Sequence, residues 1–268
     1  MNGTVGFVGC GNMGGALIRA AAKKLPGNRI YLNNRHPEKA EALAKETGAK
    51  AVGADELFEK SDVIFIGVKP VDTEELFGSL RPALAKKGGR TLLVSMVSGY
   101  TLDRLGTLAG TGTPIIRIMP NTPAAVGEGM IQYTPNENAA EEDIADLLFL
   151  LSEAGICDRI DERLMDAASA ISGVGPAFAA MFAEALADGA VACGLSRDKA
   201  YLYAAQTLIG AGRMLAEGGT HPGEIKDGVC SPGGSTIVGV RALENGGMRA
   251  AVMNAVIASF EKTVAESV

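Results

Sequence analysis

The most constraining feature of the sequence is a glycine-rich turn that joins an apolar strand to an apolar helix near the start of the chain. Thr4 to Val8 predicts a short strand, and Gly9, Gly11 and Gly14 follow it in the spacing G-x-G-x-x-G. The first glycine of such a turn permits a tight bend, the second lets the backbone approach a pyrophosphate, and the third lets the helix pack closely on its strand. The turn therefore predicts a dinucleotide site made by Val8, Gly9, Cys10, Gly11, Asn12, Met13 and Gly14.

The second predicted strand ends at the position where a dinucleotide-binding fold contacts the ribose of its ligand. Arg29 to Asn33 has the pattern of a strand, and Asn34 and Arg35 follow it, about 20 residues beyond the last glycine. An acidic residue here would bind the 2′-hydroxyl of NAD, whereas Arg35 beside Asn34 suits the 2′-phosphate of NADP. We expect NADPH as the cofactor, with NADH as an alternative donor. The competing interpretation is an ordinary solvent-exposed arginine after a strand.

Three further apolar runs continue the alternation of strands and helices. Val63 to Val68, Arg90 to Ser95 and Ile115 to Met119 are typical of buried parallel strands. Their loops, VKP, VSG and MPN, should gather at the carboxyl ends of the strands, where open α/β sheets bind ligands. The prolines can also be explained as residues that simply end a strand. The expected cofactor site therefore also includes Val68, Lys69, Pro70, Ser98 and Asn121.

The predicted secondary structure changes near residue 161, from alternating strands and helices to helices alone. Gly129 to Tyr133, a helix over 144–152 and a strand over 156–160 complete the first part. Alanine-rich stretches with helical periodicity follow at 162–173, 177–193, 197–216 and 248–265. The predicted fold is α/β: a Rossmann-type dinucleotide-binding domain over 1–160, then an all-α domain over 161–268. The helices have few large side chains, so either a second subunit covers their apolar faces or they form a self-contained bundle.

A second glycine-rich turn, CSPGGSTIVGV, runs from Cys230 to Val240 in the helical part. Two glycines after a proline, followed by apolar residues at helical spacing, predict a turn that opens a helix. The first N–H groups of a helix lack partners and face the positive end of its dipole, so a small carboxylate or phosphate could bind there. The alternative is an ordinary helix cap made by Ser235 or Thr236.

Charge and cysteine usage narrow the class of partner and the compartment. The net charge is −6 and the pI is near 5.1, without basic clusters, which argues against nucleic-acid or anionic-membrane partners. Cys10, Cys157, Cys193 and Cys230 have no paired spacing, which favours a reducing compartment. The two histidines, 36 and 221, stand in no metal-ligand motif, so we expect no catalytic metal.

The apolar segments of the sequence predict neither a leader nor a membrane span. The opening MNGTVGFVG lacks the basic region and the uninterrupted apolar stretch of a secretory signal. The longest uncharged run, Ala167 to Ala183, contains Gly175-Pro176 and is rich in alanine, so we interpret it as a buried helix pair. We expect a cytoplasmic protein.

Six stretches together resemble the pyrroline-5-carboxylate reductase family: GFVGCGNMG, IGVKP, MPNTP, ADGAVACGL, HPGEIKDGV and CSPGGSTI. The resemblance runs from Val5 to about Lys262, and the last two stretches are its most specific part. It implies reduction of 1-pyrroline-5-carboxylate to L-proline with NAD(P)H, the last step of proline biosynthesis. It also implies a homodimer or a larger ring built from dimers, in which Thr236 of one chain can serve the cofactor of its neighbour.

In this family the second glycine-rich turn holds the substrate carboxylate through its backbone N–H groups. Carried over to this sequence, the resemblance implies a substrate site made by Ser231, Gly233, Gly234, Ser235 and Thr236. It further implies that the Thr236 hydroxyl lies near the ring nitrogen, which makes this residue the one catalytic candidate. Val174 and Phe178 depart from the family pattern and put polar substrate contacts from their turn in doubt. Met96 and Val97 are bulkier than the small residues that the family usually has near the nicotinamide.

Two other functions compete with this interpretation. β-Hydroxyacid dehydrogenases and related imine reductases share the glycine turn and a helical second domain, but they place a catalytic lysine in G-x-G-x-x-x-K. Here Gly173-Val174-Gly175 is followed by Pro-Ala-Phe-Ala, with no lysine at that place. The second competitor is a catalytically silent NADP-sensing protein, which would have lost the substrate turn, whereas Gly233, Gly234 and Thr236 are intact.

Overall fold

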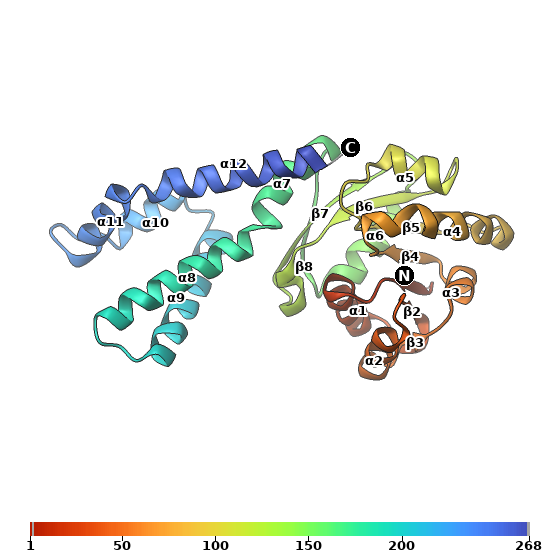
Figure 1. Cartoon of the computed structure of the whole chain (residues 1–268), viewed down its shortest axis with the longest axis horizontal. Helices are drawn as coiled ribbons and strands as arrows, with labels where there is room; N and C mark the ends of the chain where they lie inside the picture. Colours follow the sequence, from red (N-terminus) through yellow and green to blue (C-terminus); the bar gives the residue numbers. More distant parts are fainter. Residues whose placement is uncertain (2, 267–268) are drawn as a thin grey trace. The chain divides into compact units, whose positions relative to one another are not determined.

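A single twisted sheet of eight strands forms the centre of the first part of the chain (Figure 1). The structure, a computed structural model, describes Met1 and residues 3–266. Its strand order is β3-β2-β1-β4-β5-β6-β7-β8, and the crossover at β1 and β4 is the switch point of a doubly wound fold. The strands are β1 (Val5–Val8), β2 (Ile30–Asn33), β3 (Lys50–Ala51), β4 (Val63–Ile66), β5 (Leu92–Ser95), β6 (Ile115–Met119), β7 (Gly129–Pro135) and β8 (Gly155–Arg159).

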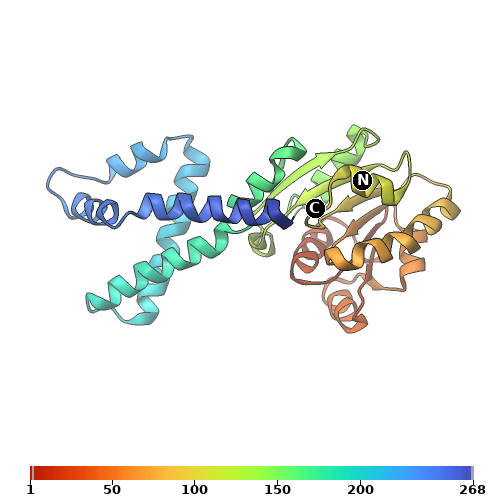
Figure 2. The same cartoon turned by 45° about the horizontal axis from the view of Figure 1, so that its top comes forward.

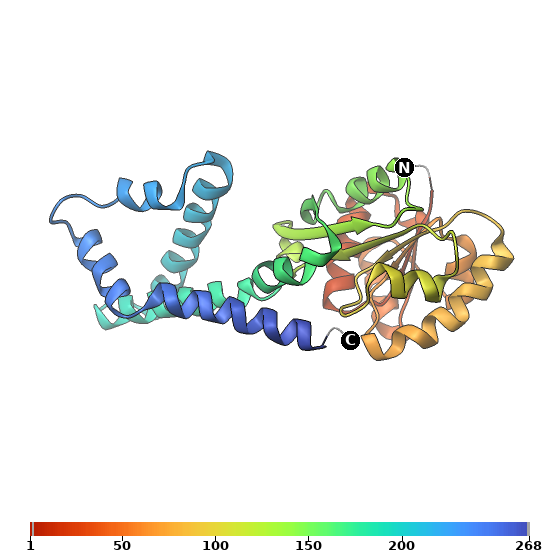
Figure 3. The same ribbon diagram turned by 90° about the horizontal axis from the view of Figure 1, so that it is seen from above.

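Helices cover both faces of the sheet because successive residues of each central strand point to opposite sides. Phe65 packs in a core with α1 (Asn12–Lys24), α2 (Pro37–Thr47) and α6 (Glu141–Leu151). Its neighbours Ile64 and Ile66 pack in a second core with α3 (Ala54–Lys60), α4 (Thr73–Lys87) and α5 (Leu102–Ala109). Figure 3 shows the sheet between these two helical layers. The unbroken apolar run of β4 thus reflects burial on both faces.

The predicted strands are confirmed, with differences in detail. The strand predicted over Val63 to Val68 ends at Ile66, so Val68 lies in the loop that follows. The two-residue strand β3 was missed because it is too short to show a period. Strand β7 runs antiparallel to β6, whereas all other neighbours are parallel. The connection between β6 and β7 is too short for the crossover that a parallel pair needs.

The chain divides into two compact units, and the first extends past the predicted boundary at residue 160. One unit is Met1–Gly173, grouped with the segment from Phe260, and the other is Val174–Ser259. Helix α7 (Met165–Ser172) belongs to the first unit. A partly buried ion pair attaches the segment before it to β6, with 2.9 Å between Arg117 Nη1 and Glu162 Oε1. The boundary of the functional domains stays a prediction.

The second unit is entirely helical in the part that the structure describes, as the sequence predicts. It contains α8 (Gly175–Ala192), α9 (Arg197–Gly218), α10 (Pro222–Gly228), α11 (Ser235–Asn245) and the first part of α12 (Met248–Glu266). Helices α8 and α9 form a hairpin, drawn in teal and cyan in Figure 2. The buried core of this hairpin consists of Ala187, Ala200 and Ala204.

Large apolar side chains on these helices remain exposed. Met181 on α8, Leu202 on α9, Val238 on α11 and Met253 on α12 are each more than half exposed. The predicted burial of the run from Ala167 to Ala183 is therefore wrong for most of the run in the single chain, in which only Ala170 of these residues is buried. One helical stretch, Glu162–Ala192, has the length and apolar composition of a membrane span, a test that soluble core helices also pass. The isolated unit is not a self-contained bundle.

Candidate active site

The first glycine-rich turn leaves β1 in a conformation that only glycine adopts easily. Gly9 has a φ of +107°, and its N–H donates to the Asn33 carbonyl at 2.9 Å, which closes the turn onto β2. Gly11 is the N-cap of α1, and a Cβ placed on it would meet no protein atom within 4 Å. Gly14 is buried, and a Cβ there would lie 2.0 Å from the Gly9 carbonyl oxygen. The three glycines therefore have three different reasons to be glycine.

This turn fits the pyrophosphate of a dinucleotide. The first N–H groups of α1 lack helical partners, and the first turn of α1 has no acidic residue to compete with an anion. The open space beside Gly11 leaves its backbone accessible to a ligand.

Asn34 supports the glycine turn from the neighbouring loop. Its side-chain oxygen accepts from the Cys10 N–H at 2.8 Å, and its side-chain nitrogen donates to the His36 carbonyl at 3.0 Å. The predicted cofactor residue thus holds the cofactor loop in place, and its direct contact with the cofactor stays a prediction. Burial raises the pKa of the Cys10 thiol to about 11, so this side chain is neutral at physiological pH.

The remaining predicted cofactor residues lie in loops after β2, β4, β5 and β6, at the same edge of the sheet. Arg35 is exposed, and its Nη1 lies 3.0 Å from Asp72 Oδ1 in the loop after β4. In that loop Lys69 is exposed and Pro70 begins a short 3-10 turn. The buried Tyr100 donates its hydroxyl to the Pro70 carbonyl at 3.2 Å. Ser98 is exposed in the loop after β5.

Asn121 is buried, and both ends of its side-chain amide are engaged by the protein. Its nitrogen donates to the Ser172 carbonyl at 2.9 Å, and its oxygen accepts from the Met130 N–H at 2.8 Å. Gln132 adds a hydrogen bond to the Ser172 hydroxyl at 3.0 Å. These bonds attach the end of α7 to the loop after β6. Sequence reasoning missed Gln132 and Ser172, because no local motif marks partners that lie 40 residues apart.

The second glycine-rich turn forms the start of α11, in the second unit. Gly233 has a φ of +71°, and Gly234 is the N-cap, with its N–H donating to the Ser231 carbonyl at 3.0 Å. Ser235 and Thr236 are the first two residues of the helix, so neither is the cap that the alternative interpretation requires. The Thr236 side chain is exposed, and its hydroxyl has no hydrogen-bond partner among the described residues. The turn thus offers free N–H groups beside a free hydroxyl.

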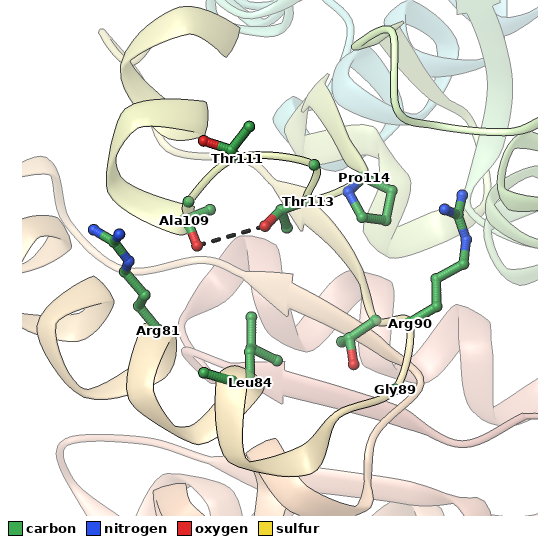
Figure 4. Close-up of a pocket in the computed structure, with 12 residues that line it drawn as sticks. Arg81, Leu84, Gly89, Arg90, Ala109, Thr111, Thr113 and Pro114 are labelled. Carbon is green, nitrogen blue, oxygen red and sulfur yellow. Dashed lines mark hydrogen bonds between the residues drawn. The ribbon is translucent and has the colours of Figure 1, made fainter.

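A hollow of about 630 Å³ lies at the other edge of the sheet and contains no predicted site residue (Figure 4). Arg81 of α4 and Arg90, just before β5, stand on opposite sides of it, and the loop after α5 lines the rest. Thr113 in this loop donates to the Ala109 carbonyl at 3.5 Å. Because the hollow lies at the amino ends of β5 and β6, it is separate from the loops that carry the glycine turn.

Comparison with known proteins finds matches to both parts of the chain. The family described as "Pyrroline-5-carboxylate reductase dimerisation" matches residues 162–265. The family described as "NADP oxidoreductase coenzyme F420-dependent" matches residues 4–99. The first match covers the exposed apolar helices and the second glycine-rich turn, and the second match covers the first turn and the Arg35 loop.

Individual relatives match over nearly the whole chain. The chain is 42% identical to the pyrroline-5-carboxylate reductase of Escherichia coli (strain K12), over 98% of both sequences. It is 38% identical to that of Glycine max, over 97% of this chain and 94% of the relative. The crystal structure of Plasmodium falciparum pyrroline carboxylate reductase with NADP bound is 32% identical, with a TM-score of 0.87 over 100% of this chain and 99% of that one.

Proposed function

We propose, on the premise that this chain belongs to the pyrroline-5-carboxylate reductase family, that its two glycine-rich turns serve the two ligands of one reaction. The chain is an NAD(P)H-dependent oxidoreductase that reduces 1-pyrroline-5-carboxylate to L-proline, the last step of proline biosynthesis. In our assignment the turn from Gly9 to Gly14 holds the cofactor and the turn from Ser231 to Thr236 holds the substrate. The open space beside Gly11 is the observation that carries the first half of this assignment.

NADPH is the cofactor, and when bound it supplies the hydride. We assign its pyrophosphate to the start of α1, where free N–H groups and the helix dipole favour an anion. Arg35 holds the 2′-phosphate, because a guanidinium forms paired, charge-assisted hydrogen bonds with phosphate oxygens. The loops that carry Val68, Lys69, Pro70, Ser98 and Asn121 line the rest of the site.

The substrate carboxylate binds at the start of α11 in this proposal. The N–H groups of Ser235 and Thr236 lie in the first turn of a helix, where an anion is stabilised by both hydrogen bonds and the dipole. The Thr236 hydroxyl, which has no partner among the described residues, is free to hydrogen-bond at the ring nitrogen. A threonine is a poor acid at neutral pH, so this hydroxyl acts as a hydrogen-bonding group or as a relay to water.

The proposed site contains few acid and base residues, which agrees with the chemistry of imine reduction. A protonated imine accepts hydride readily, so the main task of the protein is to orient the substrate carbon and to exclude water. Orientation by backbone N–H groups depends on a turn in which Gly233 has a φ of +71°, a conformation that favours glycine.

The exposed apolar helices form the surface through which copies of this chain associate. Their side chains, such as Met181 and Leu202, need a partner surface, and the matched family is a dimerisation domain. We propose a homodimer, or a ring built from dimers, in which the turn at Thr236 of one chain serves the cofactor of its partner. We also propose a cytoplasmic location, without nucleic-acid or membrane partners, from the acidic charge and four free cysteines.

Steady-state kinetics with a substrate pair tests the proposed function. Purified enzyme should oxidise NADPH, and more slowly NADH, only when 1-pyrroline-5-carboxylate is present. The matched control is 1-pyrroline, which has the same ring and no carboxylate and should show a much higher KM. Equal KM values for the two imines would contradict the assigned carboxylate site. Quenching of NADPH fluorescence without turnover would instead support the NADP-sensing alternative.

A further inference from the structure

An ion pair joins the two loops that flank the proposed 2′-phosphate site. Arg35 follows β2 and Asp72 follows β4, and 3.0 Å separates Arg35 Nη1 from Asp72 Oδ1. The Arg35 side chain is 79% exposed, whereas that of Asp72 is 29% exposed. Asp72 is thus the more enclosed partner, and Arg35 reaches it from solvent.

The position of Asp72 is set by its own turn. The Asp72 N–H donates to the Lys69 carbonyl at 3.0 Å, and the buried Thr73 donates its hydroxyl to the same carbonyl at 3.2 Å. Tyr100 holds the adjacent Pro70 carbonyl. Although Asp72 is the N-cap residue of α4, its side chain makes no capping hydrogen bond. The carboxylate is therefore directed to Arg35 on a supported backbone, while Arg35 has a long side chain with several free torsions.

We propose that Asp72 is a specificity-determining residue that opposes the binding of cofactors with a 2′-phosphate. This inference rests on the proposed role of Arg35. Asp72 occupies the guanidinium that a 2′-phosphate must use, and its negative charge lies on the supported loop beside that phosphate. Binding of NADPH therefore weakens the Arg35–Asp72 pair and brings two like charges together. Binding of NADH, which carries only a hydroxyl there, leaves the ion pair intact.

Equilibrium binding to the Asp72→Asn variant tests the proposal. The dissociation constants of NADPH and NADH are measured by nucleotide fluorescence, and those of 2′,5′-ADP and 5′-AMP by calorimetry. We expect 2′,5′-ADP and NADPH to bind between about twofold and tenfold more tightly, the scale of one exposed ion pair plus one relieved repulsion. NADH and 5′-AMP should be unchanged. The gain in affinity for 2′,5′-ADP and NADPH should shrink at high salt, because solvent reaches the Arg35–Asp72 pair and salt screens its charges.

The Glu74→Gln variant is the matched control. Glu74 is an acid in the first turn of the same helix, but its partner is Arg104, at 2.9 Å. This variant removes the same charge and should leave the dissociation constants of NADPH, NADH, 2′,5′-ADP and 5′-AMP unchanged. Improved binding of 2′,5′-ADP by Glu74→Gln equal to that of Asp72→Asn would overturn the proposal, because the effect would then come from net charge alone.

Other outcomes also decide the question. Weaker binding of 2′,5′-ADP to Asp72→Asn would overturn the proposal and show that Asp72 orients Arg35 for the phosphate. Unchanged binding would overturn it too. In an Arg35→Ala background the gain from Asp72→Asn should be smaller, since only the relieved repulsion between Asp72 and the phosphate remains and the part that comes from the ion pair is lost. If Arg35→Ala alone leaves the NADPH preference intact, the assigned role of Arg35 fails, and this failure is separate from that of Asp72.

Discussion

The carbonyl oxygen of Gly9 lies 2.0 Å from the point that a Cβ on Gly14 would occupy. No side chain fits at this distance from a backbone oxygen, so the third glycine of the turn is a requirement of the fold. Gly11 differs, because a Cβ there meets no protein atom within 4 Å. We propose that the requirement for glycine at position 11 comes from the bound cofactor.

Alanine substitutions should separate these two requirements. Gly14→Ala should lower the free energy of unfolding by about 1 to 3 kcal/mol or more, since the backbone must shift to admit the methyl group. Gly11→Ala should change it by less than about 1 kcal/mol, because the loss of a good N-cap residue and the lower entropy of the unfolded chain oppose each other. Gly11→Ala should nevertheless weaken NADPH binding. Urea denaturation and fluorescence titration measure the two effects, and equal destabilisation by both variants would contradict the distinction.

Arg35→Ala should weaken NADPH more than NADH. We expect a loss of about 1.5 to 3 kcal/mol in NADPH binding, the value of a hydrogen bond to a charged group. Arg35→Lys should have an NADPH affinity between those of the wild-type enzyme and Arg35→Ala, because lysine keeps the charge and loses the planar pair of donors. Dissociation constants for both cofactors provide the measurement. Equal losses for NADPH and NADH would show that Arg35 does not bind the 2′-phosphate.

Gly234→Val should impair substrate binding while leaving the cofactor site intact. A Cβ on Gly234 would lie 2.3 Å from Ser231 Oγ and 3.2 Å from the Ser231 carbonyl oxygen, so the Ser231 side chain must move and the larger valine side chain crowds the turn before α11. We expect a higher KM for 1-pyrroline-5-carboxylate with NADPH binding unchanged, because the cofactor is held at Gly9 to Gly14. A parallel loss of NADPH affinity would mean that the substitution disturbs more than this turn.

Thr236→Ala should lower kcat by about 10² to 10⁴ if the hydroxyl assists protonation in the transition state. Thr236→Ser keeps the hydroxyl and should recover much of the rate. The stability of Thr236→Ala should hardly change, since Gly234 is the N-cap and the hydroxyl has no partner among the described residues. A loss of about 1 kcal/mol in stability with kcat preserved would show that the residue contributes to the stability of α11 and has no catalytic role.

Two inactive variants should restore activity to each other if one site uses both chains. Gly11→Val should block the cofactor turn at a position where a Cβ meets no protein atom within 4 Å, and Thr236→Ala should disable the substrate turn. In a mixed dimer one site then carries both defects and the other carries neither, so an equal mixture should regain about a quarter of the wild-type activity. Mixtures are refolded together and assayed. Activity no higher than that of the separate variants would place both turns of a site in one chain.

The sequence alone determined the features that depend on local backbone geometry and on periodicity. The spacing of Gly9, Gly11 and Gly14 marks the dinucleotide turn, because Gly9 has a positive φ and a Cβ on Gly14 would lie 2.0 Å from the Gly9 carbonyl oxygen. The apolar runs locate β1, β2, β4, β5 and β6, since a strand buried on both faces needs consecutive apolar residues. The turn before α11 is marked in the same way, by Gly233, which has a positive φ.

Tertiary structure alone decided which side chains are free to meet a ligand. Asn34 and Asn121 were predicted as cofactor residues, yet both side-chain amides are engaged by protein groups. The partner of Arg35 is Asp72, 37 residues away, and no local pattern links the two. The antiparallel pairing of β7 and the exposed faces of α8 and α9 likewise follow from long-range packing. A motif specifies the conformation of its own segment, whereas hydrogen-bond partners and burial are set by segments that meet only after the chain has folded.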